Sequence, residues 1–127
     1  MKQIYRADKR GNLTEILKGM KAPKLLMLMS NAKQFEEHVQ ELEKQFPGVP
    51  SIGCIGGSYG GQEVAAENGV AVIAMEGNLT VATNVLEQAS TMPVKYIGRL
   101  EADINKVGAS EKNTVCIDFC TGNDACV

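Results

Sequence analysis

The stretch KLLMLMSNAKQFEEHVQELEKQFPGVPSIGCI, residues 24–55, decides the fold of this chain. Its beginning, KLLMLMS, carries apolar side chains on both faces of an extended chain, which is typical of a central strand covered on both sides. Residues 32–46 then follow the periodicity of an amphipathic helix. The apolar stripe of that helix consists of Phe35, Val39, Leu42 and Phe46. The helix is broken by FPGVP, and SIGCI (51–55) is predicted as a second buried strand, so the stretch forms a parallel crossover unit.

Further elements are predicted on both sides of this unit: helices over 11–20 and 94–108, and strands over 68–75, 79–86 and 113–120. Asn12 is expected to cap the first helix, with Glu15 at the capping-box position. Gly77-Asn78 suits a two-residue loop and predicts a hairpin between the two strands that flank it. The predicted fold class is therefore α/β, with a mixed, partly parallel sheet, flanking helices and an antiparallel hairpin.

The length of 127 residues is enough for one core of ordinary size. The last turn, TGNDACV, resembles the start of a helix that Asn123 or Asp124 would cap, but the chain stops at Val127. We therefore expect a single domain over residues 1–127 that is truncated before a C-terminal partner domain.

Composition argues against several classes of partner. The net charge is −2 and aromatic residues make up 5% of the chain, so no basic patch or base-stacking platform for nucleic acid is expected. No apolar run approaches the ~20 residues that cross a bilayer, and the N-terminus has no signal-peptide core. We expect a cytoplasmic protein without membrane insertion, whose four cysteines stay reduced.

The glycine-rich stretch PSIGCIGGSYGG (50–61) invites a comparison with phosphate-binding loops. It lacks the Lys-Ser/Thr pair of a P-loop, and the following residues soon become a strand rather than the helix of a dinucleotide site. Two interpretations remain open: a connection between strands, or a loop whose backbone amides contact a small ligand.

The cysteines suggest two further kinds of chemistry. Cys54 would need a base to act as a nucleophile, and the one histidine, His38, is expected on a solvated helix edge. Cys116 and Cys120 have the spacing of half a zinc site, but they lie in a predicted strand without a second pair, so no metal is expected. On that strand Cys116, Asp118 and Cys120 share one face, at a strand end where α/β sheets often bind ligands.

With the strand at 24–30, the helix at 32–46 and VPSIGCIGGSYGG in place, the chain resembles the FIST N-terminal sensory domain. The resemblance rests mainly on Ile52, Gly53, Cys54 and the glycines that follow. It implies a non-enzymatic input module of bacterial signalling or chemotaxis proteins, which binds small ligands such as amino acids and is joined to an output domain. Some members look like haem sensors, but the expected surface setting of His38 argues against haem, and no cofactor is predicted.

We expect the ligand where the loop after strand 50–55 meets the turn after strand 114–120. The candidate ligand-binding residues are Cys54, Gly56, Gly57, Ser58, Asp118, Cys120, Thr121, Asn123 and Asp124. The amides of Gly56, Gly57 and Ser58 would hold a carboxylate, and Asp118 or Asp124 an amino group. Two alternatives stay open: a thiol-dependent enzyme built on Cys54 or Cys120, and a homodimer that associates through an exposed sheet edge.

Overall fold

A computed structural model describes residues 1–56, 67–87 and 94–119 of the chain. The chain divides into two compact units, Met1–Leu79 and Thr80–Val127, and each is described by itself.

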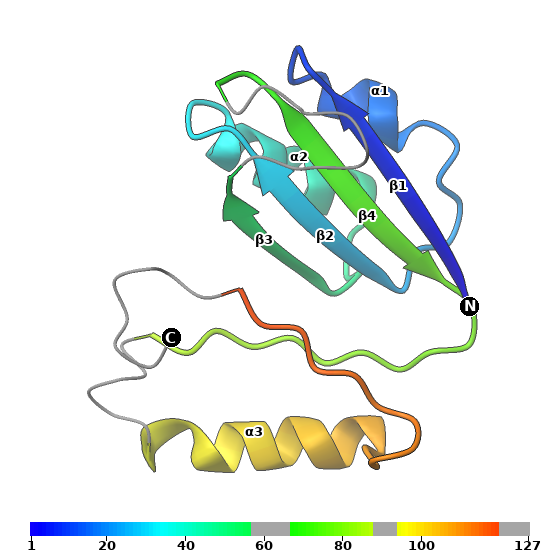
Figure 1. Cartoon of the computed structure of the whole chain (residues 1–127), viewed down its shortest axis with the longest axis vertical. Helices are drawn as coiled ribbons and strands as arrows, with labels where there is room; N and C mark the ends of the chain where they lie inside the picture. The colour runs from blue at the N-terminus through cyan, green and yellow to red at the C-terminus, as the bar shows by residue number, and fades with distance from the viewer. Residues whose placement is uncertain (57–66, 88–93, 120–127) are drawn as a thin grey trace. The chain divides into compact units, whose positions relative to one another are not determined.

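The first unit is built on one mixed sheet (Figure 1). Its strands are β1 (Lys2–Asp8), β2 (Leu25–Ser30), β3 (Ser51–Ile55) and β4 (Val70–Glu76), in the spatial order β1-β4-β2-β3. β2 and β3 are parallel, whereas β4 runs antiparallel to both β1 and β2. The predicted mixed, partly parallel sheet is confirmed, and β2 occupies an interior position as its two apolar faces indicated.

The predicted hairpin is wrong. β4 pairs with β2 and β1, while residues 79–86 form no strand. The physical reason lies in β4 itself, because Val70, Ala71 and Val72 on both of its faces are at most 1% exposed. A strand this deeply buried needs neighbours on both edges, and Gly77, with a φ of +119°, turns the chain out of the sheet.

Two helices cover one face of this sheet (Figure 1): α1 (Leu13–Leu17) and α2 (Phe35–Gln45). Asn12 caps α1 as predicted, because its side-chain oxygen accepts a hydrogen bond from the Glu15 amide. α2 begins later than expected, since Asn31 folds back and accepts the Gln34 amide in a turn before the helix. The apolar core lies between these helices and the sheet. It consists of Leu13, Ile16, Leu17, Met20, Leu26, Leu28, Leu42, Val70, Val72 and Ala74.

β3 differs from its prediction as a buried strand. It forms an edge of the sheet, and its residues alternate between exposed and half-buried. The glycine in its centre, Gly53, lies against β2, where an added Cβ would come within 3.1 Å of the Leu28 side chain. β3 therefore packs tightly on one edge only, which explains its partial exposure.

The second unit contains α3 (Val94–Val107), which Gly108 follows in a left-handed conformation with a φ of +62°. The predicted helix over 94–108 is thus confirmed. The predicted strand over 113–120 is wrong for the residues described, because 114–119 have no strand partner and Val115 is 84% exposed. Alternating apolar residues favour an extended chain, but a strand also requires a neighbour for its backbone groups.

None of the helices in the described ranges is long and apolar enough to span a membrane.

Candidate functional site

The parallel strands end at a common edge of the sheet. β1 and β2 both run antiparallel to β4, and β3 is parallel to β2, so Asp8, Ser30 and Ile55 end three strands on the same side. In open α/β sheets, ligands bind outside the carboxyl ends of strands. This edge is therefore the place where a binding site is expected.

Ser30 and Asn31, at the end of β2, form a buried polar junction at this edge. The Ser30 carbonyl accepts the Gly56 amide at 3.0 Å, just after β3. Asn31 donates its backbone and side-chain N–H groups to the Gly69 carbonyl, at 3.0 and 3.2 Å, just before β4. Ser30 and Asn31 are 0% and 1% exposed. Two buried residues thus bind the backbone at Gly56, within the glycine-rich stretch, and at Gly69, just before β4.

His38 belongs to the same junction, and the prediction of a solvated side chain is wrong. Its imidazole is 4% exposed, with Nδ1 2.7 Å from the Ser30 hydroxyl and Nε2 2.9 Å from the Gly11 carbonyl. Its position, three residues after Phe35 and four before Leu42, is the sequence signal for the buried stripe of α2. The expected stripe member Val39 is instead 40% exposed.

Gly11 is required where the turn after β1 meets this junction. Its φ is +78°, and an added Cβ would lie 2.2 Å from the Gln34 side-chain oxygen and 2.6 Å from the Asn68 carbonyl. No other residue fits this close approach without movement of its neighbours. The turn after β1, the start of α2 and the residues before β4 therefore meet around one glycine.

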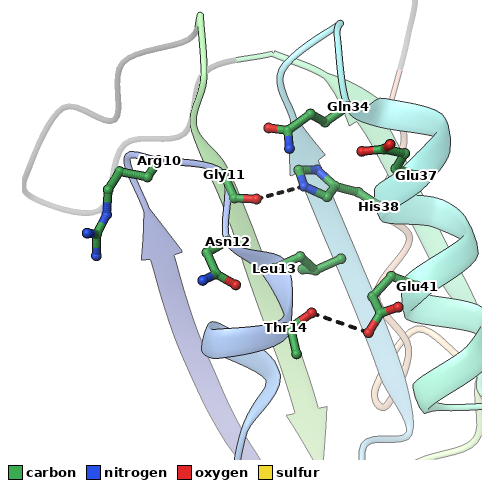
Figure 2. Close-up of a pocket in the computed structure, with 9 residues that line it drawn as sticks. All are labelled: Arg10, Gly11, Asn12, Leu13, Thr14, Gln34, Glu37, His38 and Glu41. Atoms are coloured by element: carbon green, nitrogen blue, oxygen red, sulfur yellow. Dashed lines mark hydrogen bonds between the residues drawn. The ribbon is translucent and has the colours of Figure 1, made fainter.

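A hollow of about 490 Å³ opens beside His38, between the loop before α1 and the first turns of α2 (Figure 2). Its lining residues are Arg10, Gly11, Asn12, Leu13, Thr14, Gln34, Glu37, His38 and Glu41. Glu41 accepts hydrogen bonds from Gln45 and from Thr14. The bond from Gln45 is the main cause that lowers the pKa of Glu41, against an opposing effect of burial. The carboxylate is therefore ionised at neutral pH and gives this wall a negative charge.

Comparison with known proteins connects this geometry to a family. The FIST N domain matches residues 24–125, which is most of the chain. The chain belongs to the FIST N domain family. Searches for similar curated proteins and for similar solved structures found no match.

FIST N domains are sensory domains of signal transduction, generally non-catalytic and usually paired with output domains. The match begins at Lys24, so β1, α1 and the Arg10–Thr14 wall of the hollow precede it. β1 is nevertheless part of the sheet of this FIST N domain through its pairing with β4. The Ser30–His38 pair has the spacing of a nucleophile and a base, but the Ser30 side chain is fully buried and cannot reach a substrate.

The structure places some of the sequence-predicted site residues of this FIST N domain and does not test the site as a whole. Cys54 is half-buried in β3, and Gly56 lies at the carboxyl edge of the sheet as expected. Asp118 is exposed in the second unit. The other predicted residues, Gly57, Ser58, Cys120, Thr121, Asn123 and Asp124, lie outside the described residues. The predicted ligand site therefore stays a prediction.

Cys116 and Asp118 share one side of the chain as predicted, with the thiol 3.7 Å from a carboxylate oxygen. Desolvation raises the pKa of Cys116, and the neighbouring Asp118 charge and its hydrogen bond raise it further. A raised pKa reduces the thiolate that a nucleophile or a metal site needs. Among the described residues, no group of three or more His, Cys, Asp or Glu side chains could hold a metal ion.

Proposed function

We propose that this FIST N domain is the small-molecule-sensing input module of a bacterial signal-transduction or chemotaxis protein, and that its ligands are amino acids. The observation that carries the proposal is the polar hollow beside His38, at the sheet edge where β1, β2 and β3 end. The hollow lies against a buried junction that connects three loops, so a bound molecule would contact the part of the fold to which those loops are fixed.

The charges around the hollow favour a zwitterion. Glu37 and Glu41 lie on α2, whereas Arg10 comes from the opposite loop (Figure 2). A ligand with an ammonium group and a carboxylate would match the acidic wall with the first, while its carboxylate would compete with Asp8, 3.8 Å from Arg10, for the guanidinium. Thr14, Asn12 and Gln34 add uncharged polar groups that could orient it.

The glycine-rich stretch is the second proposed location for the ligand. Gly56 follows β3 at the same edge of the sheet, and backbone amides from Gly56, Gly57 and Ser58 would bind a carboxylate. The two locations predict different mutational effects. Charge removal in the hollow weakens binding in the first case, and substitution of Ser58 weakens it in the second.

A panel of amino acids and small carboxylates, screened by thermal shift and followed by calorimetric titration, tests the proposal. We expect at least one amino acid to raise the melting temperature, and Glu37→Gln and Arg10→Gln each to weaken its binding about tenfold. Glu43→Gln, an exposed change on α2 outside the hollow, is the matched control and should leave binding unchanged. A folded domain that responds to no member of the panel would contradict the proposal.

The proposal includes a cytoplasmic setting and a C-terminal output domain that receives the signal. Sedimentation of this chain, and of the longer protein that its coding sequence specifies together with the sequence downstream, tests the homodimer and the partner domain. The alternative of a thiol-dependent enzyme predicts fast alkylation of Cys54 or Cys120 by iodoacetamide at neutral pH, which mass spectrometry would detect.

A further inference from the structure

The Ser30 hydroxyl has one hydrogen and two acceptors within reach. Its oxygen lies 2.7 Å from Nδ1 of His38 and 3.0 Å from the Asn31 carbonyl. A carbonyl oxygen only accepts hydrogen bonds, whereas a ring nitrogen accepts when bare and donates when protonated. The direction of the Ser30 hydrogen therefore depends on whether Nδ1 carries a proton.

The other ring nitrogen removes the ambiguity. Nε2 of His38 lies 2.9 Å from the Gly11 carbonyl, which can only accept, so Nε2 carries the hydrogen of this bond. In the neutral ring Nδ1 is then bare, and it accepts the Ser30 hydrogen. In the charged ring Nδ1 donates to the Ser30 oxygen, and the hydroxyl hydrogen turns to the Asn31 carbonyl.

Both arrangements satisfy the buried side chains. No buried side-chain nitrogen or oxygen lacks a hydrogen-bond partner in the part of the chain that the structure describes. In the charged form the imidazolium has two acceptors, the Ser30 oxygen and the Gly11 carbonyl, which are the partners that a buried cation requires. Protonation of Nδ1 thus reverses the hydrogen bond between Ser30 and His38 and gives the Ser30 hydroxyl hydrogen to the Asn31 carbonyl.

We propose that Ser30, His38 and Asn31 form a proton-dependent hydrogen-bond switch beside the hollow that His38 lines. This goes beyond the sensing of a small molecule, because the proton is a second input that needs no ligand. Asn31 also holds the Gly69 carbonyl, and Ser30 holds the Gly56 amide. Ser30 and Asn31 thus take part in the switch through the hydroxyl and the Asn31 carbonyl, and they bind the backbone at Gly56 and Gly69 through other groups.

Charged groups lie on the segments beside the ring. Glu37 and Glu41 on α2 and Arg10 on the loop after β1 line the hollow together with His38. Asp8, the last residue of β1, pairs with Arg10, and Lys33 on the segment before α2 pairs with Glu67. Asp8 and Arg10 lie 3.8 Å apart, so they offset one another. The two glutamates share the hollow with His38.

Nuclear magnetic resonance of the full chain without ligand provides the test, because His38 is the one histidine and its ring signals are unambiguous. The titration runs from about pH 8 to about pH 5, where histidines as a class change charge. The reporter is the amide nitrogen of Ala32, which shares its peptide group with the Asn31 carbonyl. We expect its chemical shift to change with the same midpoint as the ring nitrogens of His38.

Ser30→Ala removes the hydroxyl, so the Ala32 shift should lose its dependence on the ring while His38 still titrates. Ser51→Ala, an exposed serine change in β3, is the matched control and should keep the coupled titration. If Ser30→Ala fails to fold, His38→Gln provides the second test, and the pH response of Ala32 should vanish there too.

Three results would overturn the switch: a His38 ring that does not titrate in this interval, an Ala32 shift that ignores the ring in the unaltered chain, or coupling that survives in Ser30→Ala. None of these results depends on an amino acid in the hollow. A failed ligand screen and a failed titration therefore contradict two different proposals.

Discussion

Two amphipathic helices, one in each unit, differ in how deeply their apolar side chains are buried. In the unit Met1–Leu79, α2 buries Leu42 to 4% exposure against the sheet, together with His38. In the unit Thr80–Val127, α3 has an equally regular apolar stripe, yet Ile97, Leu100 and Ile104 are 58%, 40% and 54% exposed. Helical periodicity thus predicts the helix in both cases. Burial depends on a partner surface, which α2 has in β2.

The two units also differ in how many hydrogen-bonded polar side chains they bury. The first unit buries Ser30, Asn31 and His38 with hydrogen bonds for each. In α3 the one buried residue is Tyr96, whose hydroxyl donates to the Glu87 carbonyl. A specific buried network therefore accompanies the packed sheet, and substitutions in the two units should have unequal effects.

The largest effect is expected from truncation in the core of the first unit. Leu28→Ala, at a side chain 2% exposed, should lower the free energy of unfolding by about 3 kcal/mol, because it leaves a cavity between β2 and the helices. Ile104→Ala in α3, 54% exposed, should change it by less than about 0.5 kcal/mol. Urea unfolding followed by circular dichroism measures both. Equal losses would show that α3 is as well packed as the sheet and would remove the contrast.

A comparison of two glycines in the first unit distinguishes the energetic cost of backbone strain from the cost of close packing. Gly11 and Gly19 share a φ of +78°, but an added Cβ meets nothing within 4 Å at Gly19. Gly19→Ala should therefore cost about 1 kcal/mol from the backbone alone. Gly11→Ala should cost about 2 kcal/mol, since Gln34 and Asn68 must also move. Thermal unfolding of the two variants provides the comparison, and similar melting temperatures would argue against a tight contact at Gly11.

Substitution of two asparagines compares the stability contributed by a helix cap with that contributed by an exposed helix position. Asn12→Ala removes the cap of α1 and should destabilise the first unit by about 1 kcal/mol. Asn105→Ala, on the exposed surface of α3, should be neutral or slightly stabilising because alanine favours a helix. Denaturant midpoints distinguish the two results. A neutral Asn12→Ala would mean that the bond to the Glu15 amide does not stabilise α1.

The smallest effect is on chemistry rather than stability, and it lies in the second unit. Asp118→Asn removes a negative charge beside Cys116, so the pKa of the thiol should fall toward its ordinary value. Alkylation by iodoacetamide below that pKa should then become several-fold faster, since the gain in thiolate exceeds the loss in its reactivity. Cys54 in the same chain is the internal control, and mass spectrometry follows both sites. An unchanged rate at Cys116 would contradict the assigned influence of Asp118.

Periodicity, residue type and spacing predicted the elements whose formation depends mainly on residues close together in the chain. The order β2, α2, β3 and the helix α3 follow from residue periodicity, and the Asn12 cap follows from residue type and spacing. β1 escaped prediction because KQIYRAD mixes charged and apolar residues, and its pairing partner β4 lies more than sixty residues further along the chain. Strand pairing at such a distance leaves little local signal.

The candidate site was less accessible to sequence analysis. The polar character of His38 suggested a solvated side chain, although its place between Phe35 and Leu42 on the helix indicated the buried stripe. The hollow combines residues 10–14 with residues 34–41, and that juxtaposition appears only when the loop after β1 docks on α2. The sequence did place Gly56 at the carboxyl edge of the sheet, which the structure confirms.

The way Ser30 and Asn31 hold Gly56 and Gly69 has a consequence for how such a domain can change through evolution. Because both attachment points belong to the framework, the intervening chain can gain, lose or exchange residues without a shift in the register of β3 or β4. Descendants of this chain could therefore differ in length and sequence there while the sheet, its helices and the imidazole beside Gly11 are inherited unchanged.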